Sequence, residues 1–404
     1  MTDLTDAAAT DLPRLPFPRD SVVDVAPLYA RLRAAAPVTP VRTPAGDPAW
    51  LVTGYDEARA LFADPRLGRA HPDPERASRI SGSALLGGSI GDAASERTQH
   101  ALMRSLLAPA FSARRMRMLT TRVDGLVATL LDDLAAHGSP ADLHAHLSLP
   151  LPVLVICELL GVPYADRDRF RAASEGAGGL TDREASARAL DDLVGYIREL
   201  VGRKRTEPGE DVLSDIVEKI PRGNGAGDGA VARLGAVLLF AGHETTVTRI
   251  DVGTLLLLDA PGQWAALAAD PGAARGAVEE VLRLAAPSGG GGLPRYAQAE
   301  VEIAGVTIAT GDAVLLAAGV ANRDPARFVD PDRFDPARES NLHLAFGHGA
   351  HYCIGAALAR VELEAVFSAL PQRFPGLALD VDPATLALRT DLLTGGLDTL
   401  PVRW

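Results

Sequence analysis

The chain has 404 residues, and its 47% apolar and 23% charged content is ordinary for a folded globular protein, which excludes disordered and fibrous classes. Its 40 Lys and Arg against 52 Asp and Glu give a net charge of −12, which argues against nucleic-acid binding because an acidic surface repels phosphates. The chain has two cysteines, no secretory signal and no uninterrupted apolar stretch long enough to span a bilayer, so we expect a soluble cytoplasmic protein without membrane contact.

The N-terminal part predicts a short tail followed by one domain. Residues 1–12 are expected to be a flexible tail and residues 13–404 a single domain, because no repeat or long linker divides the chain. Apolar residues on one side predict a helix over 24–34. Two β-like runs, at 38–42 and 49–53, are joined by a Pro- and Gly-containing segment and predict a hairpin.

The rest of the chain predicts a mainly α protein with a smaller β portion. Asp56 is a candidate cap for a helix that runs to residue 62, and residues 65–97 predict a long loop. Helical patterns dominate residues 98–218, and after a glycine-rich loop at 221–229 a long helix is expected over 231–258. The remaining predicted elements are helices at 274–284 and 354–370, strands at 301–303 and 314–317, and a weak β region at the C-terminus.

The most informative segment is residues 346–355, which read FGHGAHYCIG. Its glycines permit positive φ or close approach to a flat group, and the helix expected after Cys353 points its positive end at the sulfur. We expect that helix end to lower the pKa of the thiol and to favour the metal-binding thiolate. A lone cysteine lacks the partners of a zinc or iron–sulfur site but suits a haem iron. Cys157, in an apolar run without glycines, is expected to be a core thiol.

This segment resembles the haem loop of the cytochrome P450 superfamily, F-G-x-G-x-H-x-C-x-G, at every fixed position. The resemblance covers nearly the whole chain and implies the P450 fold, a triangular prism with a long central helix over the haem. It implies haem b (iron protoporphyrin IX) with the Cys353 thiolate as axial ligand. It also implies that Phe346, Gly347 and Gly355 help to bind the haem. The alternative, a buried apolar thiol in a glycine-rich turn, does not account for the whole pattern.

A second motif is predicted to be structural. Glu280 and Arg283 are three residues apart in AVEEVLRL, so they share a helix face that the apolar neighbours predict to be buried. From the spacing alone, an ordinary helix ion pair would be the default. The resemblance identifies the pair with the Glu-x-x-Arg motif of the family, which an arginine of a later Pro-x-Arg-Phe segment completes, and this places the third member of the triad at Arg333.

The long predicted helix contains AGHETT, from Ala241 to residue 246, where glycine, an acid and two hydroxyls are poor helix-interior choices. Ala241 and Gly242 leave room against a planar cofactor, and Thr245 can bond back to the carbonyl of Ala241 and open a groove. The motif resembles the oxygen-activation motif of the family, which implies that Glu244 and Thr245 deliver protons. His243 occupies the variable position and is expected to be packed or solvated.

Several cations are candidates for haem carboxylates. His100 and Arg104 lie four residues apart in TQHALMR and share a helix face. The resemblance implies that both bind haem propionates, together with Arg295 and with His351, two residues before the cysteine. Arginine suits carboxylates because its planar fork is always charged.

The resemblance to soluble bacterial P450s of natural-product pathways implies a monooxygenase that uses O₂ to hydroxylate or epoxidise a small-molecule intermediate of secondary metabolism. Ferredoxin and ferredoxin reductase are the expected electron donors, because the chain shows no flavin or iron–sulfur motif, and a monomer is expected. Residues 114, 115 and 117, all arginines, are a candidate ferredoxin contact, and a solvated basic patch is an equal alternative.

Two other functions stay open. The Gly289–Gly292 run and the LPR segment that follows it bear a short resemblance to P450s that couple aromatic cyclodipeptides, which implies oxidative C–C or C–N coupling of tryptophan-containing substrates without oxygen insertion. A non-catalytic haem sensor is the other alternative, and Glu244 with Thr245 argues against it because a sensor needs no proton delivery. We expect four segments to line the substrate pocket: residues 66–97, 166–203, 286–294 and 392–396.

Overall fold

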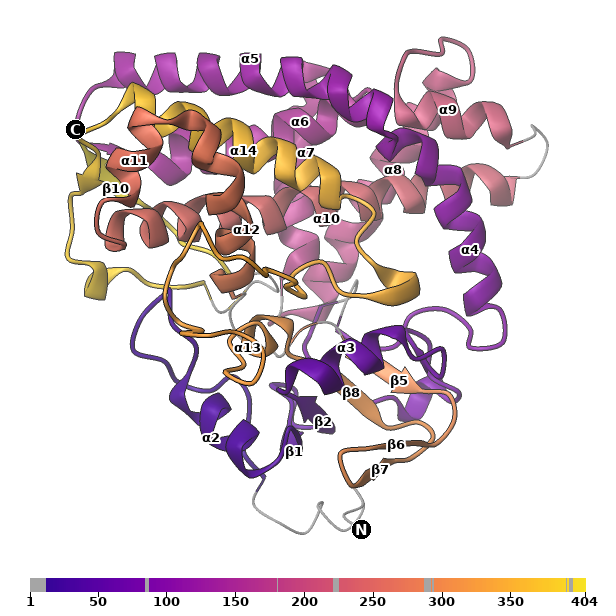
Figure 1. The fold of residues 1–404 in the computed structure, drawn as a ribbon. Helices are drawn as coiled ribbons and strands as arrows, with labels where there is room; N and C mark the ends of the chain where they lie inside the picture. Colours follow the sequence, from indigo (N-terminus) through magenta and orange to yellow (C-terminus); the bar gives the residue numbers. More distant parts are fainter. Residues whose placement is uncertain are drawn as a thin grey trace.

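A computed structural model describes residues 12–83, 87–179, 181–220, 225–286, 292, 294–389, 391 and 395–404. Most of the predicted tail and of the Gly289–Gly292 run therefore lies outside the described residues. A large helical part lies above a smaller part that holds most strands (Figure 1). The prediction of a mainly α fold with a smaller β portion is confirmed.

The described helices are spread along most of the chain. Their bounds are α2 (Pro27–Ala35), α3 (Tyr55–Ala63), α4 (Glu96–Leu107), α5 (Ala113–His137), α6 (Pro150–Leu160), α7 (Arg167–Gly178), α8 (Arg183–Lys204), α9 (Val212–Lys219), α10 (Gly225–Asp259), α11 (Gln263–Ala269), α12 (Ala274–Leu284), α13 (Ala318–Ala321) and α14 (Ala356–Arg373).

The strands form three described sheets. Their bounds are β1 (Val38–Arg42), β2 (Pro48–Val52), β3 (Leu67–Gly68), β4 (Ala141–Asp142), β5 (Pro294–Ala297), β6 (Val301–Ile303), β7 (Val306–Ile308), β8 (Ala313–Leu316), β9 (Ala378–Leu379) and β10 (Pro401–Arg403). The five-stranded sheet has the order β1-β2-β8-β5-β3, a three-stranded sheet has the order β4-β10-β9, and β6 pairs with β7.

The predicted hairpin is confirmed: β1 and β2 pair antiparallel with Val38 opposite Val52. The expectation that Asp56 caps the next helix is wrong. Helix α3 begins at Tyr55, whose N–H donates to Asp324 Oδ2 at 2.9 Å. A carboxylate 269 residues away in sequence therefore supplies the cap. The expected loop over residues 65–97 includes β3, which pairs with β5 and so brings this segment beside Arg295.

Helix α10 runs through the middle of the helical part (Figure 1). It begins at Gly225, so the prediction that the glycine-rich loop continues to residue 229 is wrong. The glycines are tolerated because tertiary packing outweighs helix propensity. A Cβ at Gly227 would lie 3.2 Å from Ile220, and one at Gly235 would lie 2.8 Å from Ile197 of α8.

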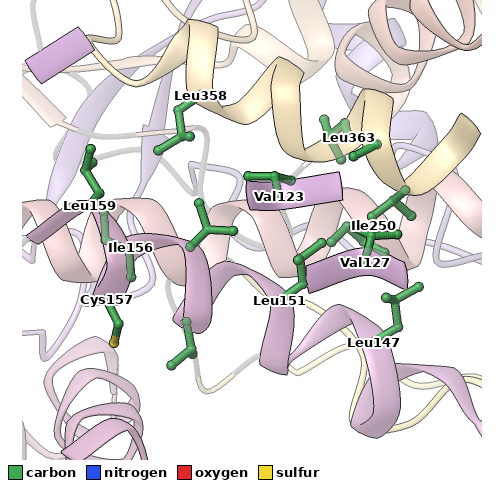
Figure 2. Packing of buried hydrophobic residues seen from close by; sticks show 14 of the residues in the cluster. Val123, Val127, Leu147, Leu151, Ile156, Cys157, Leu159, Ile250, Leu358 and Leu363 are labelled. Atoms are coloured by element: carbon green, nitrogen blue, oxygen red, sulfur yellow. The ribbon is translucent and has the colours of Figure 1, made fainter. Parts of the chain in front are cut away.

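The main core joins α10 to α5, α6 and α14. Figure 2 shows side chains of these helices, including Val127, Leu151, Ile250 and Leu363, gathered in one apolar cluster. Cys157 belongs to this cluster and is buried, which confirms the prediction of a core thiol. No helix among the described residues combines the length and apolarity needed to cross a membrane.

Candidate functional site

The cysteine loop connects the segment after α13 to the start of α14. The Cys353 N–H donates to the Phe346 carbonyl at 2.9 Å, which closes the loop. Gly347 and Gly349 have φ of 71° and 72°, a left-handed conformation that side chains disfavour. A Cβ at Gly349 would also lie 2.8 Å from the Cα of Ala63, at the end of α3. Backbone conformation and close packing both require glycine at this point.

Part of the Cys353 residue is exposed to solvent, but surrounding protein atoms shield its thiol from most of the solvent. The net shift of its pKa is opposite to the expected one: burial raises the pKa of the thiol, because it disfavours the charged form, and outweighs the expected effect of the helix end. The Gly355 N–H opposes this effect, as do nearby guanidiniums. Those cations are Arg104 of α4, Arg249 of α10 and Arg360 of α14.

The four predicted propionate-binding residues come together from three parts of the chain: α4 carries His100 and Arg104, β5 carries Arg295, and the turn before Cys353 carries His351. The rings of His100 and His351 lie 4.1 Å apart. Arg104 Nη1 donates to the Tyr352 carbonyl at 2.8 Å, which ties α4 to the cysteine loop. Burial and then the charge of Arg295 lower the pKa of His351 to about 4.

Arg69 is a fifth member of this cation cluster that sequence reasoning missed. Its Nη1 donates to the Pro294 carbonyl at 2.7 Å, while its buried Nη2 has no partner among the described residues. Burial, and then the neighbouring Arg295, lower the pKa of Arg69 to about 9. No local pattern marks this arginine, because it reaches Arg295 only through the pairing of β3 with β5.

The cation cluster is not neutralised within the described part of the chain. Glu96, whose charge acts on Arg69 and Arg295, accepts the backbone N–H groups of Arg69 and Ala70 at 2.6 and 3.0 Å. Among the described residues no carboxylate lies within ion-pair distance of the Arg69, Arg104 or Arg295 guanidinium. Desolvated like charges of this kind are stabilised by an anion.

The AGHETT segment lies inside α10. Ala241 and Thr245 are exposed, although α10 runs through the middle of the helical part. Thr245 Oγ1 donates to the Ala241 carbonyl at 2.8 Å, as expected, but α10 remains a continuous helix through this point. Glu244 and His243 are both buried, so His243 is packed and not solvated.

Gly242 was expected to leave room for a planar cofactor, but it faces helix α6. A Cβ at this position would lie 3.1 Å from Cδ1 of Ile156, on α6. Glycine here therefore permits close packing of α10 against α6, and the side of the helix that Ala241 and Thr245 share is the open one.

Arg249 is a second residue that sequence reasoning missed. It lies one turn after Thr245, on the same side of α10. Burial lowers its pKa to about 10, and the Cys353 thiol opposes this shift. The cysteine loop and the hydroxyl-bearing turn of α10 thus face a common region of the protein.

The predicted ion pair of α12 is fully buried. Arg283 donates from Nε and Nη2 to the two oxygens of Glu280, at 2.8 and 2.6 Å. The prediction that Arg333 completes a triad is wrong: its side chain is 67% exposed and approaches Asp335 at 3.8 Å. Arg338 instead donates from Nε to Glu280 Oε1 at 3.2 Å. Arg333 contributes its carbonyl, which accepts from Arg283 Nη2 at 3.1 Å.

Comparisons with known proteins agree with this geometry. Residues 274–390 match the family model described as cytochrome P450. The chain is 46% identical to pentalenolactone synthase from Streptomyces exfoliatus, over 97% of this chain and 99% of that protein. It is 42% identical to the cytochrome P450 monooxygenase PikC from Streptomyces venezuelae, over 96% and 92% of the two chains.

The fold is also that of a solved P450. The substrate-free structure of PimD, a polyene macrolide antibiotic pimaricin epoxidase, superposes with a TM-score of 0.87 at 41% identity, over 98% of this chain and 100% of that one. The predicted P450 fold is confirmed. The chain belongs to the cytochrome P450 family of haem-dependent monooxygenases.

Proposed function

We propose that Cys353 holds haem b as its axial thiolate ligand. The observation that carries the proposal is the convergence of a glycine-shaped cysteine loop with a desolvated cation cluster that lacks a carboxylate partner among the described residues. Haem would take one protein thiolate as an iron ligand and would present two propionates, which such cations would neutralise. The residues present therefore fit the group.

The cations bind and orient the group from its carboxylate side. Arg69, Arg295 and Arg104 supply guanidiniums, and His100 and His351 supply ring N–H donors. Phe346, Gly347 and Gly355 shape the loop around the sulfur. Bound haem supplies oxygen activation, in which electrons and protons reduce one atom of O₂ to water while the other enters the substrate.

The proton route is assigned to α10. The Thr245 hydroxyl lies on the open side of the helix and donates its one proton to the Ala241 carbonyl, so its oxygen lone pairs are free to accept a proton. When it accepts one, it can release its own proton from the carbonyl and pass it on. Glu244, the adjacent acid, is the source of the proton that the hydroxyl accepts. Ala241 has a small side chain, which leaves this side of the helix open beside the Thr245 hydroxyl.

The proposed substrate is a small-molecule intermediate of bacterial secondary metabolism, and the proposed reactions are hydroxylation and epoxidation. Pentalenolactone synthase, PikC and a pimaricin epoxidase are similar over nearly their whole lengths. Oxidative coupling has no comparable support. The Gly289–Gly292 run, on which this alternative was based, lies largely outside the described residues. Gly292 has another explanation, since it has φ of 91° and its Cβ would lie 2.6 Å from the Leu316 carbonyl oxygen.

Electrons are proposed to come from a ferredoxin and its reductase to a monomeric cytoplasmic enzyme. Of the three arginines considered for ferredoxin contact, Arg115 is engaged, because its Nη2 lies 2.5 Å from Asp215 Oδ2. Arg114 and Arg117 are exposed and stay as the candidate contact. If they dock a ferredoxin, turnover at limiting ferredoxin falls steeply as salt rises.

The ligand assignment is tested by Cys353→Ala. We expect the variant to lose the reduced-CO absorbance band that marks thiolate-ligated haem, because alanine cannot donate to iron. Cys157→Ala is the matched control, since its thiol belongs to the apolar core. A thiolate band in Cys353→Ala would overturn the assignment.

The proton route is tested by Thr245→Ala, with Thr246→Ala as control because that hydroxyl bonds back to the Gly242 carbonyl in the same way. We expect Thr245→Ala to divert most reducing equivalents to peroxide, while product formation per electron pair consumed in the control stays near the wild-type value. An unchanged ratio of product to consumed electrons in Thr245→Ala would remove this hydroxyl from the route.

The mass of the product separates the two candidate reactions. Oxygen insertion adds one oxygen, whereas oxidative C–C or C–N coupling removes two hydrogens.

A further inference from the structure

Glu279 precedes the buried Glu280 but belongs to a separate set of contacts. Arg360 of α14 donates to it in bidentate fashion, from Nε to Oε1 at 2.6 Å and from Nη2 to Oε2 at 3.0 Å. His343 Nε2 lies 3.1 Å from the same Oε2. We call Glu279, His343 and Arg360 the Glu279 cluster. It joins α12, α14 and the segment that leads into the cysteine loop.

The histidine of this cluster has a defined orientation. Its Nδ1 accepts the backbone N–H of Ala345 at 3.3 Å, so its Nε2 carries the proton that Glu279 accepts. The His343 side chain is only 3% exposed. These two hydrogen bonds fix the backbone immediately before Phe346, where the cysteine loop begins.

The arginine of the cluster contacts the loop itself. The Arg360 guanidinium carbon lies 4.7 Å from the centre of the Phe346 ring, in cation–π geometry. The Phe346 carbonyl in turn accepts the Cys353 N–H. A chain of contacts therefore runs from the Glu279 carboxylate through Arg360 and Phe346 to the backbone of Cys353.

The charged groups of the Glu279 cluster also act electrostatically near Cys353. The Arg360 guanidinium stacks on Phe346, whose carbonyl accepts the Cys353 N–H, so its positive charge lies beside the cysteine loop. Hydrogen bonds from His343 and Arg360 overcome the effect of burial and lower the pKa of Glu279 to about 2, so this carboxylate is ionised at neutral pH. The negative charge of Glu279 thus offsets the positive charge of Arg360 close to the proposed iron ligand.

We propose that the Glu279 cluster is a positioning group that holds the Phe346 end of the cysteine loop and sets the reduction potential of the haem iron through the balance of its two charges. The inference rests on Cys353 being the iron ligand. Ferric and ferrous haem differ by one charge, so a neighbouring cation favours the reduced state and a neighbouring anion favours the oxidised state.

The test is spectroelectrochemical titration of the holoenzyme. Glu279→Gln leaves Arg360 uncompensated, so we expect a more positive potential. Arg360→Met leaves Glu279 uncompensated, so we expect a more negative one. Each reduction equilibrium constant should change about tenfold, or ~59 mV for a one-electron couple. The double variant Glu279→Gln/Arg360→Met should return towards the wild-type potential.

Charge and position are separated by Arg360→Lys. The lysine keeps the charge but loses the fork and the planar stack, so the potential should stay near wild type while the fraction of thiolate-ligated haem in the reduced-CO spectrum falls. The matched control is the pair at the far end of the same helix, where Arg373 approaches Asp132 at 3.3 Å on the surface. Asp132→Asn and Arg373→Met should leave both measurements unchanged.

The proposal is overturned if Glu279→Gln and Arg360→Met have the same potential as the two control variants, or if both move it in one direction. Glu279→Gln retains a hydrogen-bonding side chain and supplies the decisive reading should Arg360→Met fail to fold. Failure of the ligand assignment looks different. In that case Cys353→Ala keeps the thiolate band, whereas failure of this inference leaves that band dependent on Cys353.

Discussion

The Glu280 network and the cation cluster are both buried and charged, but they differ in whether their charges are matched within the protein. Glu280 receives Arg283 and Arg338, and Arg283 also donates to backbone carbonyls, so each charge has protein partners. In the cation cluster, the charge of Arg295 lowers the pKa of Arg69, and both arginines lower the pKa of His351. No carboxylate among the described residues pairs with these two arginines. The comparison separates charges that hold the fold together from charges arranged for an anionic group.

The largest expected effect is on stability and concerns the Glu280 network, whose charges are matched within the protein. Glu280→Gln leaves the Arg283 charge buried without its carboxylate, so we expect unfolding free energy to fall by about 3–5 kcal/mol, measured by urea unfolding followed by circular dichroism. Arg333→Met is the control and should change stability by less than about 0.5 kcal/mol, because its side chain is mostly exposed. If Arg333→Met proved as damaging as Arg338→Met, the reassignment of the third arginine would be wrong.

An intermediate effect, on haem binding, is expected in the cation cluster. Arg295→Leu should raise the haem dissociation rate about 10- to 100-fold, the range given by losing a hydrogen bond to a charged group. The same change should leave the unfolding free energy of the haem-free protein unchanged or higher, because it removes a desolvated like charge. Arg66→Leu is the control, since Arg66 pairs with Asp64 at the surface. A haem-free Arg295→Leu protein less stable than wild type would contradict the distinction between the two regions.

The smallest expected effect concerns acid stability of the Glu279 cluster, another matched group. The pKa of Glu279 is about 2 in the folded protein against an ordinary value of 4.5. As pH falls, the Glu279 carboxylate is therefore protonated in the unfolded chain before it is protonated in the folded protein. The stabilisation that is present above pH 4.5 is lost as pH falls towards 2. We expect it to amount to about 1–2 kcal/mol, because the pair is partly exposed.

This stabilisation is measured as the loss of unfolding free energy between pH 7 and pH 3. Glu279→Gln should lose less over that range than wild type, and Asp132→Asn should match wild type. An identical pH profile for Glu279→Gln and wild type would show that the paired Glu279 carboxylate adds nothing to stability.

Features built from neighbouring residues could be predicted from the sequence. The cysteine loop is shaped by its own glycines, the Thr245 hydroxyl bonds to a carbonyl four residues earlier, and the Glu280–Arg283 pair lies within one helical turn. Each depends on contacts inside a few residues, so local pattern and backbone geometry suffice. The hairpin and the bounds of α12 were predictable for the same reason.

Features built from distant segments were decided only by the tertiary structure. Arg338 and not Arg333 meets Glu280, because the turns between them point one side chain inward and the other into solvent. Arg69 joins the cation cluster through strand pairing. Asp324, far away in sequence, caps α3 in place of Asp56. The sequence by itself determined the chemistry of the loop and of the central helix, whereas the choice among chemically equivalent charged side chains required the three-dimensional packing, since one residue type in several nearby positions carries no local signal for which of them is buried.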